Sequence, residues 1–289
     1  MVGSASSVPG CARGISHRVP SGAMPQAPVD GISLFYERRG AGEPVLLIQG
    51  MSGTHLAWGE AFMAALGDDL DVVAYDHRGV GDSTPQTDAF TIARLADDAA
   101  GLLDALGWDS AHVVGISMGG MVAQELALRQ PQRIRTLTLG CTYPGGAEAQ
   151  LADPALIQEL AGAVLSGDRE RALRVGFAAN LSAAHVADEA NWEPFQAMAT
   201  AVPVAVPVIM LQMQAVMGHD TSARLASIEA PPLVVHGTED RMLPVVNGAL
   251  IARSIPHARL ELLEGVGHMF WWEQPERSAA LVRSHILRD

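Results

Sequence analysis

Apolar residues along the chain alternate between short continuous runs and longer repeats at helical spacing. The runs at 44–49, 70–75, 111–116 and 232–236 are rich in Val, Leu and Ile and have the length of buried β-strands. Between the second and third runs, apolar residues recur every three or four positions from Ile92 to Leu106, which predicts an amphipathic helix. Strands that alternate with helices favour an α/β fold, in which helices cover both faces of a mostly parallel sheet.

The alternation stops between residues 144 and 229. This stretch contains no strand-like run, and its helix-like segments lie at 154–164, 169–177 and 204–217. It therefore divides the chain into a core, formed by 29–143 and 230–289, and a helical insertion.

The first 28 residues differ in composition from the rest. They are rich in Ser, Gly, Pro and Ala and contain no apolar run long enough for a signal peptide or a membrane span. We expect residues 1–28 to form a disordered tail, and Met24 is a candidate for the native start. The folded part is expected to open near Asp30 with a turn and an alternating strand.

Composition and charge narrow the classes of function. The chain has 289 residues, of which 48% are hydrophobic and 18% charged, so it can bury a substantial core. Its net charge of −13 disfavours nucleic acid or an anionic membrane as a partner and favours a neutral or weakly charged small molecule. Cys11 and Cys141 make no disulfide framework, and no Cys-x-x-Cys or His-Glu-x-x-His spacing indicates a metal. These features predict cytoplasmic chemistry without metal or cofactor.

The pentapeptide Gly115–Gly119 has the form Gly-x-Ser-x-Gly, with Ser117 at its centre. It follows the predicted strand at 111–116 and leads into a predicted helix at 118–129, so Ser117 lies at a strand-to-helix corner. Glycine on both sides relieves clashes that a Cβ atom would create in so tight a turn. The alternative is a glycine-rich turn whose serine caps the helix. The context favours Ser117 as a nucleophile.

A serine hydroxyl needs a base and an orienting carboxylate to act as a nucleophile at neutral pH. The strand at 232–236 leads to a turn-rich segment that contains Glu239 and Asp240, and the predicted strand at 260–263 leads to His268. Either carboxylate could orient the base, although adjacent side chains point in different directions. His236, on the strand before the acidic segment, could also reach the site. Asp76 and Asp82 follow another strand.

Four segments together give the chain a resemblance to the α/β-hydrolase superfamily that covers residues 29–289. They are the strand and turn at 46–51, the loop Tyr75–Ser83 with its Asp-x-Arg-Gly-x-Gly-x-Ser pattern, the pentapeptide around Ser117, and Gly267-His268 with the segment 272–276 after it. The order of serine, acid and histidine is also that of α/β-hydrolases and differs from that of the chymotrypsin and subtilisin types.

The resemblance implies a role for each residue of the site. Ser117 is the nucleophile, His268 the general base and Asp240 the acid, while the backbone N–H groups of Met51 and Met118 form the oxyanion hole. The resemblance favours a structural role for Asp76 and Asp82.

The insertion at 144–229 corresponds to the helical cap of that family. One departure is Gln49-Gly50, where many members have His-Gly. Because the oxyanion donor is a backbone amide, we expect catalysis to survive this change.

In the family that this chain resembles, the turn around Ser117 is called the nucleophile elbow. A serine there implies an enzyme that hydrolyses a carboxylic ester, including a lactone or methyl ester, without a cofactor. Haloalkane dehalogenases and epoxide hydrolases use aspartate there, and dienelactone hydrolases use cysteine, so these classes are disfavoured. Carbon–carbon bond hydrolases and cofactor-free perhydrolases share the serine layout and stay open as alternatives. Some members of the fold are receptors that bind a small ligand with little turnover.

Methionine and aromatic residues recur in the predicted cap, either as ordinary core or as the inner face of a pocket. The repeat consists of Met210, Met213 and Met217 alongside Trp192, Phe195 and Met198. Because a cap presents one face to the substrate, we expect an apolar pocket at this face. The residues that we expect to line it are Trp192 and Met213 in the cap and Met242 and Met269 near the catalytic residues.

Overall fold

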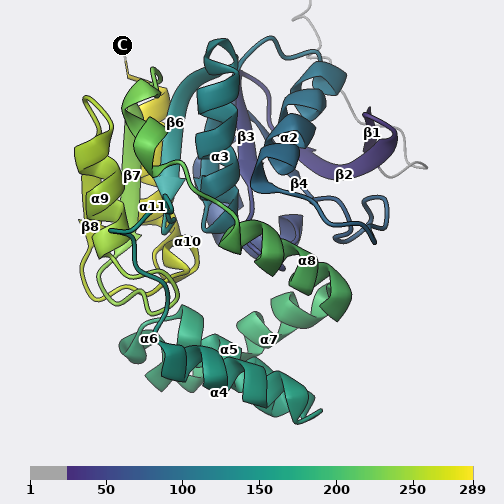
Figure 1. The fold of residues 1–289 in the computed structure, drawn as a ribbon, viewed down its shortest axis with the longest axis vertical. Helices are drawn as coiled ribbons and strands as arrows, with labels where there is room; N and C mark the ends of the chain where they lie inside the picture. The colour runs from purple at the N-terminus through teal and green to yellow at the C-terminus, as the bar shows by residue number, and fades with distance from the viewer. Residues whose placement is uncertain (1–24, 289) are drawn as a thin grey trace, which may run out of the picture.

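The computed structural model describes residues 25–288 and consists of a sheet between two layers of helices, with a cluster of further helices at one end (Figure 1). The eight strands lie in the order β1-β2-β4-β3-β5-β6-β7-β8. β1 and β2 pair antiparallel to their neighbours, and all later pairs are parallel. The strands are β1 Gln26–Val29, β2 Ile32–Arg39, β3 Glu43–Ile48, β4 Leu70–Tyr75, β5 Ala111–Ile116, β6 Ile134–Gly140, β7 Pro232–Gly237 and β8 Arg259–Leu263.

The mostly parallel α/β architecture expected from the sequence is confirmed. One boundary is corrected, because the predicted tail 1–28 included Gln26, Ala27 and Pro28, which belong to β1. A strand of four residues that contains a proline gives almost no periodic signal. Ala27 and Val29 are buried because β1 pairs with β2 and packs against α2. The rest of that tail, residues 1–24, lies outside the described residues.

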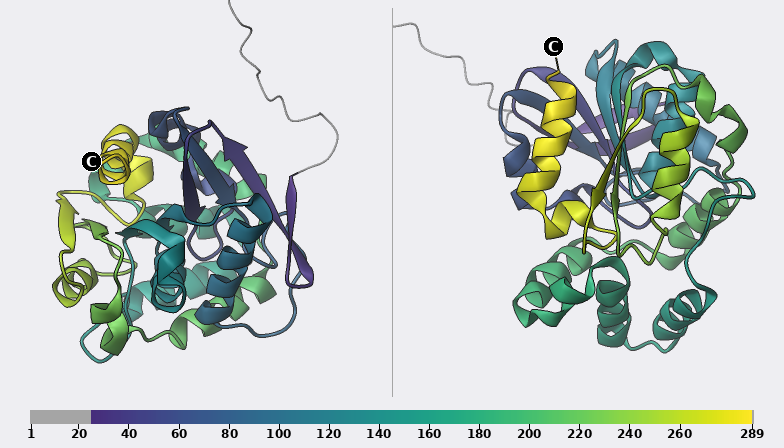
Figure 2. Two further views of the ribbon diagram at one scale, coloured as in Figure 1. Left: turned by 90° about the horizontal axis from the view of Figure 1, so that it is seen from above. Right: turned by 90° about the vertical axis from the view of Figure 1, so that its left-hand side faces the viewer.

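Helices cover both faces of the sheet, as two further views show (Figure 2). The α-helices are α1 Glu60–Leu66, α2 Ile92–Leu106, α3 Met118–Arg129, α4 Pro154–Leu165, α5 Arg169–Asn180, α6 Ala183–Ala187, α7 Trp192–Ala201, α8 Val206–Met217, α9 Val246–Ser254, α10 Phe270–Glu273 and α11 Pro275–Ile286. Short 3₁₀ helices are η1 His55–Trp58, η2 Pro131–Arg133, η3 Glu189–Asn191 and η4 Ser222–Ser227.

The central strands are buried on both faces, and their side chains alternate between two hydrophobic clusters. In β3, Leu46 and Ile48 join the cluster beneath α2, α3 and α9, whereas Val45 and Leu47 join the cluster beneath α1, α10 and α11. Continuous apolar runs therefore encode these strands, since neither face meets water. The same arrangement brings the carboxyl ends of β3, β5, β6 and β7 to one edge of the sheet.

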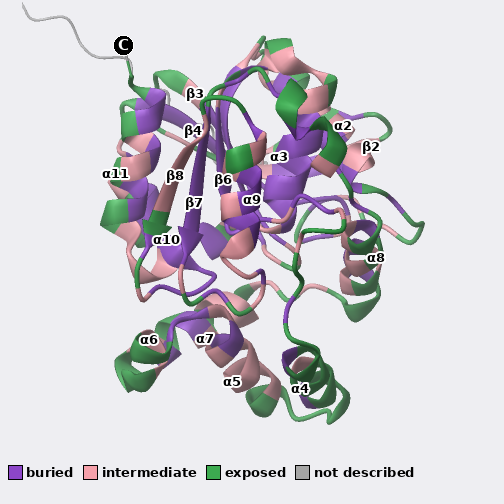
Figure 3. Ribbon diagram, turned by 60° about the vertical axis from the view of Figure 1, so that its left-hand side comes forward, coloured by how far each residue is buried: buried purple, intermediate pink, exposed green. Residues whose placement is uncertain are grey.

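The helices α4 to α8 form a cap beside this edge, and no strand occurs anywhere between β6 and β7. α4 and α6 are mostly exposed, whereas α7 contains the buried residues Trp192 and Phe195 (Figure 3). After α8 the chain returns to the core, because Leu225 and Ile228 pack in the cluster beneath α3 and α9. The predicted insertion 144–229 therefore includes a final segment that packs with the core.

Among residues 25–288, no single helix is long and apolar enough to cross a membrane. The segments Glu189–Ala201 and Val206–Met217 reach that length only as a pair, and they meet at an angle of 97°.

Candidate active site

Ser117 lies at the corner between β5 and α3 in a strained backbone conformation. Its φ of 52° is positive, which is uncommon for a residue with a Cβ atom. Two bonds from the β6 side hold it there: Ser117 N–H donates to the carbonyl oxygen of Gly140 at 2.9 Å, and Thr142 Oγ1 donates to the carbonyl oxygen of Ser117 at 2.7 Å. These two hydrogen bonds hold Ser117 in its strained conformation at the carboxyl edge of the sheet.

The two glycines of the pentapeptide are required by close packing. A Cβ on Gly115 would lie 2.3 Å from the carbonyl oxygen of Gly119, and one on Gly119 would lie 2.1 Å from that of Ile48. Both contacts are with backbone, which cannot move aside cheaply. Glycine at 115 therefore lets α3 pack closely on the end of β5, and glycine at 119 lets it pack on the end of β3.

His268 and Asp240 form a buried hydrogen-bonded pair next to this corner. His268 Nδ1 lies 2.7 Å from Asp240 Oδ2, and the other carboxylate oxygen accepts the backbone N–H groups of Met242 and Leu243, each at 2.9 Å. A carboxylate only accepts, so Nδ1 carries the proton and Nε2 of the neutral imidazole is left as a base. Ser117 and His268 line the same cavity.

The structure separates Asp240 from the alternatives that the sequence offered. Glu239 accepts a 3.3 Å bond from the N–H of Ala183 and makes none with His268. His236 is fully buried and contacts the acid instead of the cavity: its Nε2 lies 2.8 Å from the carbonyl oxygen of Leu243 and 3.1 Å from Asp240 Oδ2. Because a carbonyl only accepts, Nε2 of His236 carries a proton and can donate to Asp240 as well.

The charges of the pair oppose the effect of burial. Burial by itself would raise the pKa of Asp240, but the charge of His268 and hydrogen bonds from His236 and His268 lower that pKa to about 2. Burial would likewise lower the pKa of His268, but the negative charge of Asp240 and its hydrogen bond to the ring act in the opposite direction. The pKa of His268 therefore lies above the usual value for histidine. Asp240 is therefore ionised at neutral pH and stabilises a protonated His268.

Asp76 and Asp82 lie in the loop after β4 and make no hydrogen bond with His268 or Asp240. Asp76 is buried and accepts bonds from the backbone N–H of His55 at 2.7 Å and from its ring Nδ1, 3.0 Å away. Its backbone carbonyl accepts a 2.7 Å bond from Ser83 Oγ. These contacts tie β4 to η1.

Two backbone amides near Ser117 are free to bind a ligand. The N–H of Met118 is the first of α3 and has no acceptor within the helix. The N–H of Met51 makes no hydrogen bond to any described residue. Position 50 is close to the nucleophile, since a Cβ on Gly50 would lie 3.0 Å from the Cβ of Ser117. Met51 and Met118 each therefore offer an unpaired backbone N–H near Ser117, which is compatible with the predicted oxyanion hole.

A cavity of about 410 Å³ opens above these groups, between the core and the cap. Of the four residues expected to bind substrate, Met242 and Met269 line it, and Trp192 and Met213 do not. The cap residues that do include Phe195, Met198 and Leu173.

Trp192 instead packs in an aromatic cluster, with its ring 5.4 Å from that of Phe177, which lies 5.0 Å from that of Phe195. This corrects the expectation for Trp192 and Met213. Helical spacing showed which residues share a face, but not which edge of that face meets the cavity.

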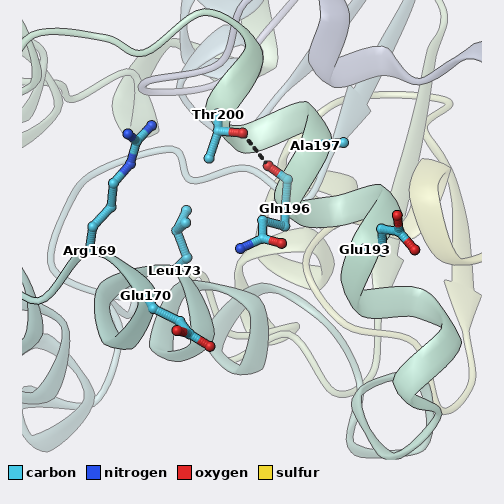
Figure 4. A pocket seen from close by; sticks show the side chains of 7 residues that line it. All are labelled: Arg169, Glu170, Leu173, Glu193, Gln196, Ala197 and Thr200. Atoms are coloured by element: carbon cyan, nitrogen blue, oxygen red, sulfur yellow. Dashed lines mark hydrogen bonds between the residues drawn. The ribbon is translucent and has the colours of Figure 1, made fainter.

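A second hollow, of about 660 Å³, lies between α5 and α7 in the cap (Figure 4). Its lining is mostly polar, and Arg169 and Leu173 also line the active-site cavity. Leu173 therefore contacts both the active-site cavity and this more polar hollow.

Within residues 25–288, no group of three or more His, Cys, Asp or Glu side chains is arranged to hold a metal ion. Cys141, at the end of β6, is buried, and burial raises the pKa of its thiol. It is therefore a neutral thiol at neutral pH.

Comparison with known proteins gives the same picture of the fold. The family model described as "alpha/beta hydrolase fold" matches residues 43–275. This range includes Met51, Ser117, Asp240 and His268 together with the whole cap.

Several curated or solved proteins are similar over nearly their whole length. RutD of Azorhizobium caulinodans, named provisionally as a carbamate hydrolase, is 31% identical over 248 residues, which are 86% of this chain and 92% of that protein. The crystal structure of a hydrolase from Pseudomonas aeruginosa PA01 has 34% identity and a TM-score of 0.78 over 93% of this chain and all of the other. Est816, described as degrading N-acyl homoserine lactones, has 30% identity and a TM-score of 0.73 over 90% and 99% of the two chains.

Proposed function

Because this chain belongs to the family with the alpha/beta hydrolase fold, we propose that it is a serine hydrolase that cleaves a carboxylic ester of an apolar small molecule. The observation that carries the proposal is the hydrogen-bonded pair of His268 and Asp240 in the cavity that also holds Ser117. A buried imidazole whose Nδ1 is bound to a carboxylate is the arrangement that activates a serine hydroxyl.

The reaction proceeds in two halves through an ester on Ser117. The Oγ of Ser117 attacks the substrate carbonyl carbon while Nε2 of His268 takes the hydroxyl proton, and Asp240 stabilises the imidazolium. The negative oxygen of the tetrahedral intermediate accepts hydrogen bonds from the N–H groups of Met51 and Met118. When the intermediate collapses, the alcohol leaves with the proton from His268. Water then attacks the acyl-enzyme by the same route, releasing the acid and free Ser117.

The lining of the cavity supports an apolar substrate. Met242, Met269, Phe195 and Met198 present flexible or aromatic surface that suits an apolar part of the substrate. Polar side chains, among them Asn180 and Arg169, line other parts of the cavity. A cavity of about 410 Å³ lies within the usual range of small-molecule sites. A lactone would react by the same steps, and a solved relative, Est816, is described as degrading a lactone.

The test is turnover and labelling of Ser117. Wild-type protein should hydrolyse p-nitrophenyl butyrate for many turnovers, and a fluorophosphonate should label Ser117 alone. Ser117→Ala should lower kcat by about 10⁴- to 10⁶-fold with an unchanged circular dichroism spectrum. Release of one equivalent of nitrophenol followed by almost none would favour a ligand-binding receptor. Labelling of another serine would contradict the assignment of Ser117 as the nucleophile.

A further inference from the structure

Gln212 is a polar residue in the buried stripe of a cap helix. The buried positions of α8 are Val208, Gln212 and Ala215, and the side chain of Gln212 is completely inaccessible, with a residue exposure of 0%. Its Nε2 atom has no acceptor among the described residues. Burial of an amide group with an unpaired nitrogen costs free energy of folding. The one hydrogen bond that the side chain does make, through its oxygen, is therefore a candidate for a functional role.

That contact is with the turn that carries Met51. The Oε1 of Gln212 accepts the backbone N–H of Ser52 at 2.9 Å, across 160 positions of sequence. A backbone N–H only donates, which fixes the oxygen end of the amide on this side. The bond therefore runs from the cap to the residue that follows the candidate oxyanion donor.

Ser52 needs support from outside its own turn. Its φ is 58°, in the left-handed region that glycine adopts freely and other residues adopt at a cost. The turn closes with a 3.2 Å bond from the N–H of Gly53 to the carbonyl oxygen of Gly50. On the core side, Gln49 Oε1 accepts the N–H of Gly50 at 2.8 Å. On the cap side, Gln212 is the anchor.

We propose that Gln212 is a positioning residue for the oxyanion hole. By holding Ser52 in its left-handed conformation, Gln212 fixes the peptide between Met51 and Ser52 and so keeps the preceding N–H, that of Met51, directed at the carbonyl oxygen of the substrate. This inference rests on the proposed function. If Gln212 has this role, the position of α8 in the cap affects the rate of the chemical step as well as the access of substrate to the cavity.

The closing experiment compares Gln212→Leu with Gln214→Leu in the full chain. Gln214 is the matched control, because it is an exposed glutamine on the same helix. Gln212→Leu should lower kcat about 10- to 100-fold and change KM less than about twofold, since a donor displaced by about 1 Å weakens the transition state more than the ground state. Gln214→Leu should match wild type in both constants.

A rescue variant separates positioning from packing. Adding Ser52→Gly to Gln212→Leu should restore most of the lost kcat, because glycine holds a φ of 58° without an external anchor. If Gln212→Leu folds poorly, Gln212→Glu provides the test, because it keeps an acceptor oxygen at the same place and should retain most of the wild-type kcat.

The outcomes distinguish this inference from the proposed function. Wild-type kcat in a folded Gln212→Leu protein, a rise in KM alone, or no rescue by Ser52→Gly would each overturn the role of Gln212 while esterase activity remained. An absence of turnover in the wild type together with no labelling of Ser117 would overturn the proposed function instead.

Discussion

The core side and the cap side of the cavity hold their residues by different forces. On the core side, the buried carboxylate of Asp240 takes part in four polar contacts, two from backbone N–H groups and two from histidine rings. On the cap side, Met198 and Leu173 are held by apolar packing. The cap also exposes large apolar side chains, with Leu165 at 85% and Met210 at 63% exposure. The difference suggests that the core sets the chemistry and the cap sets the substrate preference.

Directional hydrogen bonds define a geometry closely, whereas apolar packing permits several arrangements at similar free energy. Changes to the hydrogen-bonded residues of the core should therefore alter the rate for every substrate alike. Changes at the cavity face of the cap should alter the order of substrates, and Gln212 is the exception that links the two sides.

The largest expected effect lies in the core. Asp240→Asn should lower kcat by about 10⁴-fold for all esters, because the amide cannot stabilise the imidazolium and can favour the wrong tautomer of His268. Glu239→Gln is the matched control, as Glu239 makes no bond to His268. The ratio of the two kcat losses, measured with p-nitrophenyl butyrate, is the test. Equal losses would mean that the carboxylate is wrongly assigned.

A smaller effect should separate two residues of the same cap helix. Trp192 packs in the aromatic cluster and misses the cavity, so Trp192→Ala should lower the free energy of unfolding by about 3–5 kcal/mol and leave the order of acyl chain lengths unchanged. Met198 lines the cavity, so Met198→Ala should change relative kcat/KM between chain lengths by about 10- to 100-fold. Thermal unfolding and an ester panel on both variants provide the comparison. The reverse pattern would contradict the division within α7.

Sequence patterns captured the core much better than the cap, for physical reasons. Strand ends at one sheet edge bring Ser117, Asp240 and His268 together, and the bounds of β4 and β5 agree with the apolar runs at 70–75 and 111–116. In these elements the signal is local, because continuous burial demands continuous apolar residues.

In the cap, the decisive facts are tertiary. The rotation of α7 about its axis decides that Phe195 and Met198 line the cavity and that Trp192 does not. No local sequence pattern encodes that rotation. Gln212 has one sequence signal, because it lies at helical spacing from the buried Val208 and Ala215. Its partner Ser52 is 160 positions away, so the sequence does not reveal the contact. A polar residue within an apolar helical stripe is worth testing for such a distant partner.

The smallest expected effect is on the pH dependence of catalysis. The general base must be neutral, and Asp240 holds the pKa of His268 above its usual value, so kcat/KM should rise with pH through a pKa above 6.5. Below that pKa, the rate should fall about tenfold per pH unit, because only the neutral fraction of His268 reacts. Loss of the carboxylate in Asp240→Asn should move this limb to lower pH, since the group that favours the protonated imidazole is gone.

Met198→Ala provides the control on the cap side, since it changes no charge near His268. Its pH limb should coincide with that of the wild type even where its preference among esters differs. Profiles of kcat/KM from pH 5 to 9 for the three proteins decide the matter. A limb that moved with Met198→Ala but stayed in place with Asp240→Asn would reverse the roles given to core and cap.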